Sequence, residues 1–247
     1  MEINVDYSLF VRMERKQHST IHFVQTVFSF ANNIFLGTAL RRMGQGGEGE
    51  EEEEEEEVLE GYGNALCRVK IYEEPPEDEM SPLYNERGYW DADQLLYEKL
   101  GRQPHLNNFC LSYLFTDLRI IETRNQDLHG CAVRDGLYSL DRRQPKVGAV
   151  SFHDCPDPLD LHCMLAFAHE LGHSWGARHD PASGECIPDR GGNYLMGSPF
   201  LYEKGPNNMV SGGGGKGRIS ISLIFCLLFC FPRRFSPPAQ CETSTRR

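Results

Sequence analysis

The sequence has no apolar run of the length that crosses a membrane. The stretch ISISLIFCLLFCF, residues 219–231, is apolar and is followed by Arg233 and Arg234. It is shorter than the roughly 20 residues that a transmembrane helix needs. The N-terminal segment MEINVDYSLFVRMERK lacks the apolar core of a signal peptide. We therefore expect neither a membrane span nor a signal peptide in this chain.

Paired cysteines and basic surface are also missing. None of the nine cysteines forms a CxxC pair, which argues against a structural zinc ribbon. The number of cysteines is odd, and their spacing leaves any disulfide pairing open. The formal net charge is −11, and ten glutamates (Glu48, Glu50 to Glu57 and Glu60) account for all but −1 of it. A nearly neutral remainder gives no basic surface for nucleic acid.

What the chain does contain is an alternation of strand and helix patterns. Strands are expected in VDYSLFVR (5–12), ALCRVKIYEE (65–74), NFCLSYLFTD (108–117) and KVGAVSFHD (146–154). Helices are expected in residues 20–35, ended by Gly37, in DADQLLYEKLG, ended by Gly101, and from Pro158 to Trp175. This alternation predicts an α/β layer architecture with helices packed on a sheet.

Two segments are not expected to belong to the folded domain. The acidic run, about residues 44–60, contains eight consecutive glutamates whose mutual repulsion predicts a disordered surface insertion. Residues 210–247 begin with a glycine tract, SGGGGKGR, and have no periodic pattern. No strand precedes this tract and no Ser or Thr follows Lys216, so it is not a phosphate-binding loop. We expect a catalytic domain over residues 1–209 and a tail over 210–247.

Residues 169–180, HELGHSWGARHD, indicate a metal site. His169 and His173 are four residues apart, so on a helix both imidazoles reach one ion. Gly176 can break the helix, which allows His179 to return as a third ligand. Three neutral histidines leave the fourth position of a zinc ion open, as catalytic zinc requires. His162 lies on the same helix face as His169, one heptad earlier, whereas His153 and His105 lack ligand spacing. All three are expected to be ordinary surface or hydrogen-bonded histidines.

Glu170 is the expected general base of this site. It follows the first histidine and is rotated away from the ligand position, so that it can take a proton from water and pass it to a leaving amine. The chemistry predicted is the hydrolysis of peptide bonds without a covalent intermediate. A helix that simply exposes its histidines is the alternative interpretation.

The pattern HExxHxxGxxH followed by Asp180 resembles the adamalysin (reprolysin, ADAM) branch of the metzincins. The segment GGNYLMG, with Met196 seventeen residues after His179, resembles the methionine turn of metzincins. The segments GNY before that turn, LSYLFTD and PNNMVS are similar to the kuzbanian and TNF-α-converting-enzyme branch. Astacins continue the motif with Glu, and matrix metalloproteinases continue it with Ser or Thr. Both families are therefore a weaker match than the adamalysins. The resemblance covers about residues 3–211.

This resemblance implies a metzincin fold: a twisted, mostly parallel sheet, an active-site helix and a small C-terminal subdomain after Gly176. It implies one catalytic zinc ion and an endopeptidase that cleaves the ectodomains of membrane proteins at the cell surface. By motif, the ligands would be His169, His173 and His179, and Glu170 the general base. Met196 would form the floor of the site, and Asp180 would hold the lower subdomain in place.

The sequence departs from the family in three respects. Between Thr116 and Cys131, DLRIIETRNQDLHG replaces the usual edge strand that pairs with substrate, and we expect that strand to be missing. Cys131 and Cys186 are expected to lack their usual partners. No propeptide, disintegrin domain or membrane helix is recognised, so the chain is expected to be a fragment of a larger precursor. A catalytically impaired zinc-binding domain that acts as a binding or decoy module therefore remains the alternative to an active peptidase.

Overall fold

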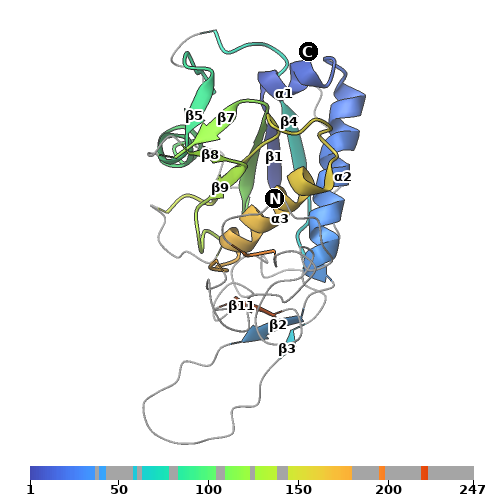
Figure 1. Ribbon diagram of the computed structural model, residues 1–247, viewed down its shortest axis with the longest axis vertical. Coiled ribbons are helices and arrows are strands. Elements are labelled where there is room, and N and C mark those ends of the chain that lie inside the picture. The colour runs from blue at the N-terminus through green and yellow to red at the C-terminus, as the bar shows by residue number, and fades with distance from the viewer. Residues whose placement is uncertain are drawn as a thin grey trace, which may run out of the picture.

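A five-stranded sheet with the order β4-β1-β6-β10-β9 forms the centre of the molecule (Figure 1). The structure is a computed structural model, and it describes residues 1–36, 39–42, 58–59, 63–77, 83–103, 109–122, 126–137, 144–179, 195–197 and 218–221. The first four strands run parallel and β9 is antiparallel to β10. The strands are β1 (Glu2–Val5), β4 (Arg68–Ile71), β6 (Ser112–Thr116), β9 (Gly130–Ala132) and β10 (Val147–Ser151).

The two faces of this sheet bury different layers, because successive side chains of a strand point to opposite sides. One face carries α2 (Gln17–Leu36) and α3 (Leu161–Ser174), and Ile3, Tyr113 and Val150 from three neighbouring strands belong to that core. The other face packs Leu114 and Ala149 against η1 (Gln94–Leu100), a short wide helix, and against a second sheet. That sheet has the order β5-β7-β8, formed by Tyr89–Asp91, Arg119–Ile121 and Asp127–Leu128. The α/β class predicted from the sequence is confirmed.

Most of the expected elements are present. The helix pattern of residues 20–35 falls in α2, whose buried side includes Val24, Val27 and Ala31 at helical spacing. Every residue of β6 and β10 is buried, as expected for parallel strands that are covered on both faces. The predicted helix from Pro158 to Trp175 corresponds to α3, which begins three residues later, at Leu161.

The prediction of one strand over residues 5–12 is wrong. The strand β1 ends at Val5, and α1 (Tyr7–Arg12) follows. Asp6 makes the difference, since its carboxylate accepts a hydrogen bond from the backbone N–H of Leu9 and so caps the helix. The same carboxylate also accepts the hydroxyl hydrogen bonds of Ser8 and Thr116. A capping residue in the middle of an alternating pattern thus ends the strand.

The expectation of a missing edge strand is also wrong. Residues 130–132 form β9, in which Ala132, Cys131 and Gly130 pair with Gly148, Ala149 and Val150 of β10. Val133 donates its backbone N–H to Val147, and the backbone N–H of Ser151 donates to His129. Because backbone groups alternate in direction along a strand, those of Gly130 and Ala132 point away from β10. No strand within the described ranges pairs with this outer side of β9.

Several predictions concern residues outside the described ranges. These include nearly all of the acidic run, most of the tail after residue 210, Cys186, Asp180 and the subdomain expected after Gly176. The backbones of β2 (Ala39–Arg42), β3 (Val58–Leu59) and β11 (Arg218–Ile221) form a separate sheet of order β11-β2-β3. The domain boundary near residue 210 therefore stays a prediction. No helix among the described residues has the length and apolarity required to cross a membrane.

The buried Asp6 predicts a specific pH dependence of stability. Burial raises the pKa of Asp6 above its ordinary value of 3.8, although the hydrogen bonds from Thr116, Leu9 and Ser8 oppose this. For a carboxyl group whose pKa is higher in the folded state, the stabilisation is complete below the unfolded pKa, about 4, and is lost as the pH rises through the folded pKa. Asn in place of Asp6 does not titrate.

We therefore expect the stability of the wild type relative to Asp6→Asn to fall as the pH rises from about 4 toward 7. The free energy of unfolding of both proteins, measured by urea denaturation across this range, tests the expectation. A difference that grows in favour of the wild type with rising pH would show that the folded protein prefers the ionised carboxylate, contrary to this account.

Candidate metal centre

The helix that carries the histidine motif is anchored at its first turn. Asp160 is the N-cap of α3, and its carboxylate accepts the backbone N–H of His162. A disulfide between Cys155 and Cys163 ties the loop after β10 to the same turn. The sequence alone left this pairing open. The start of α3 is thus held both to the sheet and to its own preceding loop.

The other end of α3 reverses direction at Gly176. Trp175 is the C-cap, and Gly176 has a φ of +91°, a conformation that favours glycine. The backbone N–H of Gly176 donates to His173, and that of Ala177 donates to Gly172. These two hydrogen bonds define a Schellman motif, which turns the chain sharply after the helix. A Cβ at position 176 would also lie 2.5 Å from Asp135 Oδ1 and would displace that exposed side chain, but it is the backbone conformation that requires glycine here.

This reversal brings three imidazoles together. The Nε2 atoms of His169 and His173 are 3.1 Å apart, those of His169 and His179 are 3.2 Å apart, and those of His173 and His179 are 3.1 Å apart. Two nitrogens bound about 2.0–2.1 Å from one tetrahedral zinc ion are about 3.3 Å apart. The three nitrogens therefore have the mutual spacing of ligands to a single ion. Among the described residues, they are the one group of three or more metal-binding side chains that converges in this way.

Two backbone carbonyls orient the rings of this cluster. His169 Nδ1 lies 2.6 Å from the carbonyl oxygen of Leu195, and His173 Nδ1 lies 2.8 Å from that of Ala177. A carbonyl only accepts hydrogen bonds, so each Nδ1 carries the proton, and in a neutral ring Nε2 is then an unprotonated donor atom. Such backbone partners are typical of histidines that bind metals.

The surroundings keep these histidines neutral. Burial, together with the neighbouring His173 and His179, lowers the pKa of His169 to about 3. Burial is also the main cause that lowers the pKa of His173 to about 4, and it lowers the pKa of His179. Three neutral rings then direct nitrogen lone pairs at one point, which is unfavourable unless a cation lies there. The three-histidine site fits zinc, whose catalytic sites use this set of ligands.

Glu170 lies beside the histidine cluster in a confined position. It is 7% exposed, and burial raises its pKa to about 8. A Cβ on Gly130 would lie 2.5 Å from Cγ of Glu170, so the glutamate packs directly on the backbone of the edge strand β9. The carboxyl group is therefore placed between the histidines' helix and the outermost strand of the sheet.

Tyr113 of the central strand β6 holds this part of α3. Its hydroxyl is fully buried, donates to the backbone carbonyl of Glu170 over 2.8 Å and lies 2.6 Å from Ser174 Oγ. Tyr113 also needs Gly148 opposite it, since a Cβ there would be 2.4 Å from its ring. The helix turn that contains Glu170 and His173 is thereby fixed to the middle of the sheet.

Met196, the predicted floor of the site, packs against α3 beside Gly172. It is 2% exposed, and a Cβ on Gly172 would lie 2.6 Å from its sulfur atom. Gly172, between the two helical histidines, thus leaves the space that Met196 fills. The preceding residue, Leu195, supplies the carbonyl that orients His169. Residues 195–197 are the described part of the predicted methionine turn.

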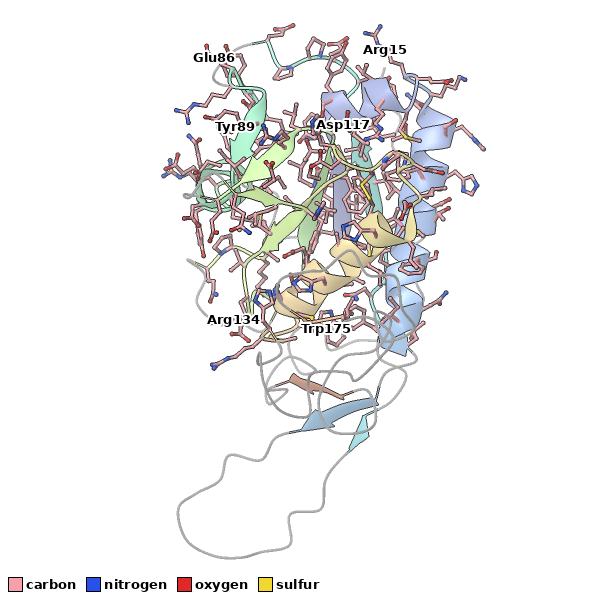
Figure 2. All side chains as sticks on the ribbon, in the orientation of Figure 1. Arg15, Glu86, Tyr89, Asp117, Arg134 and Trp175 are labelled. Carbon is pink, nitrogen blue, oxygen red and sulfur yellow. A yellow bond between two sulfur atoms is a disulfide. The ribbon has the colours of Figure 1, made fainter. Side chains whose placement is uncertain are left out.

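The structure brings together all the predicted site residues that it describes. His169, His173 and His179 converge, and Glu170, Gly176 and Met196 lie around them, whereas Asp180 is outside the described residues. Figure 2 shows Trp175 and Arg134 at this end of α3. His162 and His153 are not part of the cluster, as expected. The sequence interpretation missed Tyr113, Gly130 and Gly172, whose roles depend on contacts between distant segments.

Comparison with known proteins supports a metallopeptidase. Residues 147–204, about a quarter of the chain, match the family Reprolysin_5, described as metallo-peptidase family M12. This segment contains β10, α3, the three histidines and Met196.

Several solved structures are also similar to the chain. Archaemetzincin from Methanopyrus kandleri shares 17% identity with a TM-score of 0.46, over 83% of this chain and 87% of that one. Archaemetzincin from Archaeoglobus fulgidus shares 14% identity with a TM-score of 0.40, over 90% of this chain and 95% of that one. A chain in a structure of a chaperone-substrate complex shares 13% sequence identity with a TM-score of 0.49. That match covers 89% of the present chain and 33% of the other chain.

Removing one histidine tests the metal centre. We expect His179→Ala to weaken zinc binding by more than about 100-fold, because changes to residues that only orient the ligands already cost about 10- to 100-fold. Competition with a zinc-binding dye measures the affinity. His162→Ala, a change of the same type at a histidine outside the cluster, should keep the wild-type affinity. Equal affinities for wild type and His179→Ala would mean that zinc does not bind at the three-histidine cluster.

Proposed function

We propose that this protein is a zinc-dependent metalloendopeptidase in which His169, His173 and His179 hold the zinc ion and Glu170 is the general base. The observation that carries the proposal is the convergence of three Nε2 atoms within 3.1–3.2 Å of one another, beside a buried carboxyl group. The family match over the same residues supports the same class of enzyme.

Each part of the site contributes a different function. A zinc ion bound by the three histidines supplies Lewis acidity for the hydrolysis of an amide. Glu170, buried beside the histidines, would accept a proton from the attacking water and return it to the departing amine. Tyr113 and Met196 hold the helix and the floor, so that these groups keep their relative positions during the reaction.

The edge strand β9 offers a place for the substrate backbone. The backbone N–H and C=O groups of Gly130 and Ala132 point away from β10, and β9 lies directly against Glu170. An extended peptide that paired with this strand would pass alongside the general base. The presence of β9 removes the main reason given above for an impaired enzyme, and we favour an active endopeptidase over the binding or decoy module.

The more specific part of the proposal rests on the sequence resemblance. We propose that the enzyme is of the ADAM type and sheds ectodomains of membrane proteins at the cell surface. The motif HExxHxxGxxH followed by Asp180, with Met196 after it, supports this branch over the astacins and matrix metalloproteinases.

Loss of Glu170 tests the mechanism. We expect the zinc-loaded Glu170→Gln protein to cleave a mixed peptide library with a kcat/KM about 10²- to 10⁴-fold below wild type, the usual contribution of a general base. Zinc content should be unchanged, and a chelator should stop wild-type cleavage. Glu86→Gln, a change at an exposed glutamate, serves as the control. One zinc per chain without any cleavage by the wild type would favour the binding module, and cleavage that survives Glu170→Gln would exclude Glu170 as the base.

Shedding needs a separate test in cells. The chain, fused to a secretion signal and a membrane anchor, is expressed with a set of membrane proteins that carry extracellular tags. We expect tagged ectodomains in the medium with the wild type and not with Glu170→Gln. If peptides are cleaved in vitro but no ectodomain is released, the endopeptidase assignment remains and the sheddase assignment is wrong.

A further inference from the structure

A cavity lies at the opposite end of the central sheet from the histidines. Its volume is about 440 Å³, within the range of small-molecule sites. It is lined by residues that follow the carboxyl ends of three parallel strands: Asp6 to Ser8 after β1, Tyr72 and Glu74 to Glu77 after β4, and Leu118 after β6, together with Leu83 and Asn85. Figure 2 places Asp117 and Glu86, the sequence neighbours of Leu118 and Asn85, at this upper end, with Trp175 at the lower end.

The position of this cavity in the sheet is one at which open parallel sheets bind ligands. The chain leaves β1 toward β4 on one side, and it leaves β6 toward β10 on the other side. The strand order therefore reverses between β1 and β6. Ligands in such folds bind outside the carboxyl ends of the strands at this reversal. The cavity occupies that place and shares no lining residue with the metal centre.

The polar groups in the floor of the cavity are already satisfied. Asp6 accepts hydrogen bonds from Ser8, Leu9 and Thr116. Asn85 donates to the carbonyl of Tyr89 and accepts the backbone N–H of Arg87. The floor therefore offers mainly rigid, apolar and aromatic surface, from Tyr7, Tyr72, Pro75, Pro76, Leu83 and Leu118.

The remaining charge at the cavity is negative. Glu74 and Glu77 line it, are exposed, and have no hydrogen bond or ion pair with any described residue. None of the described residues that line it is a lysine, arginine or histidine. Two cations that do not line the cavity lie beside its tyrosines: Lys70 Nζ lies 4.2 Å from the ring centroid of Tyr72, and the guanidinium carbon of Arg15 lies 5.8 Å from that of Tyr7. Both rings thus already favour a cation in their surroundings.

We propose that this cavity binds an organic cation, a primary amine or guanidinium group carried on an apolar body. The apolar body would rest against the tyrosine, proline and leucine surface, and the cationic group would lie between Glu74 and Glu77. Such a group is found in free amines and in the basic side chains of peptides. The proposal is independent of the enzymatic function, because none of these residues belongs to the metal centre.

Binding of phenethylamine, followed by NMR of the wild-type chain, tests the proposal. We expect shifts of the Leu83 and Leu118 methyl signals, and tighter binding than that of the uncharged phenethyl alcohol. The double variant Glu74→Gln/Glu77→Gln should weaken binding about three- to tenfold, the effect of losing two exposed charge interactions. Glu73→Gln is the matched control, because Glu73 is an exposed neighbour bonded to Gln17 and does not line the cavity.

The outcomes decide the proposal and the source of the ligand. Equal binding of the amine and the alcohol, no effect of the double variant, or shifts outside the cavity would overturn it. Competition by an acetylated and amidated Phe-Lys dipeptide would identify a peptide side chain as the ligand, whereas binding of the free amine alone would identify a small amine. The same titration with His179→Ala should be unchanged, which separates this site from the metal centre.

Discussion

Three imidazole lone pairs directed at one point are the feature on which the rest of the site depends. The nitrogens are 3.1–3.2 Å apart, and burial keeps their rings neutral. Neutral lone pairs at this distance repel one another, and a cation bound between them would turn this repulsion into attraction. Two of the three rings are held by backbone carbonyls, from Leu195 and Ala177, so the orientation of the donor atoms is fixed before any ion binds.

The contacts that position the histidines and Glu170 act mainly on the last two turns of α3. The Schellman turn at Gly176 returns the chain, Met196 fills the space left by Gly172, and the Tyr113 hydroxyl ties the helix to β6. Each of these contacts joins segments that are distant in the sequence, except the turn itself. A small displacement of any of them would separate the histidines from Glu170, and catalysis depends strongly on such distances.

The two ends of the central sheet carry different groups of side chains. The histidines, Glu170 and the free side of β9 lie at one end, and the cavity beside Glu74 and Glu77 lies at the other. The sheet and its two buried faces separate them.

The sequence by itself determined which three histidines cluster, that Glu170 lies beside them, and where the main helices lie. These features depend on local spacing: His169 and His173 are four positions apart, and a glycine stands at the turn. It also indicated the buried strands β6 and β10 from their apolar runs. It failed at residues 5–12, where the capping bond of Asp6 ends an alternating pattern, and at β9, where DLHGCAV has no clear strand pattern. Only the tertiary structure decided that β9 pairs with β10, that Gly130 makes room for Glu170, that Tyr113 anchors α3 and that Cys155 bonds to Cys163. These contacts are set by which distant segments the fold brings together, and no local sequence pattern contains that information.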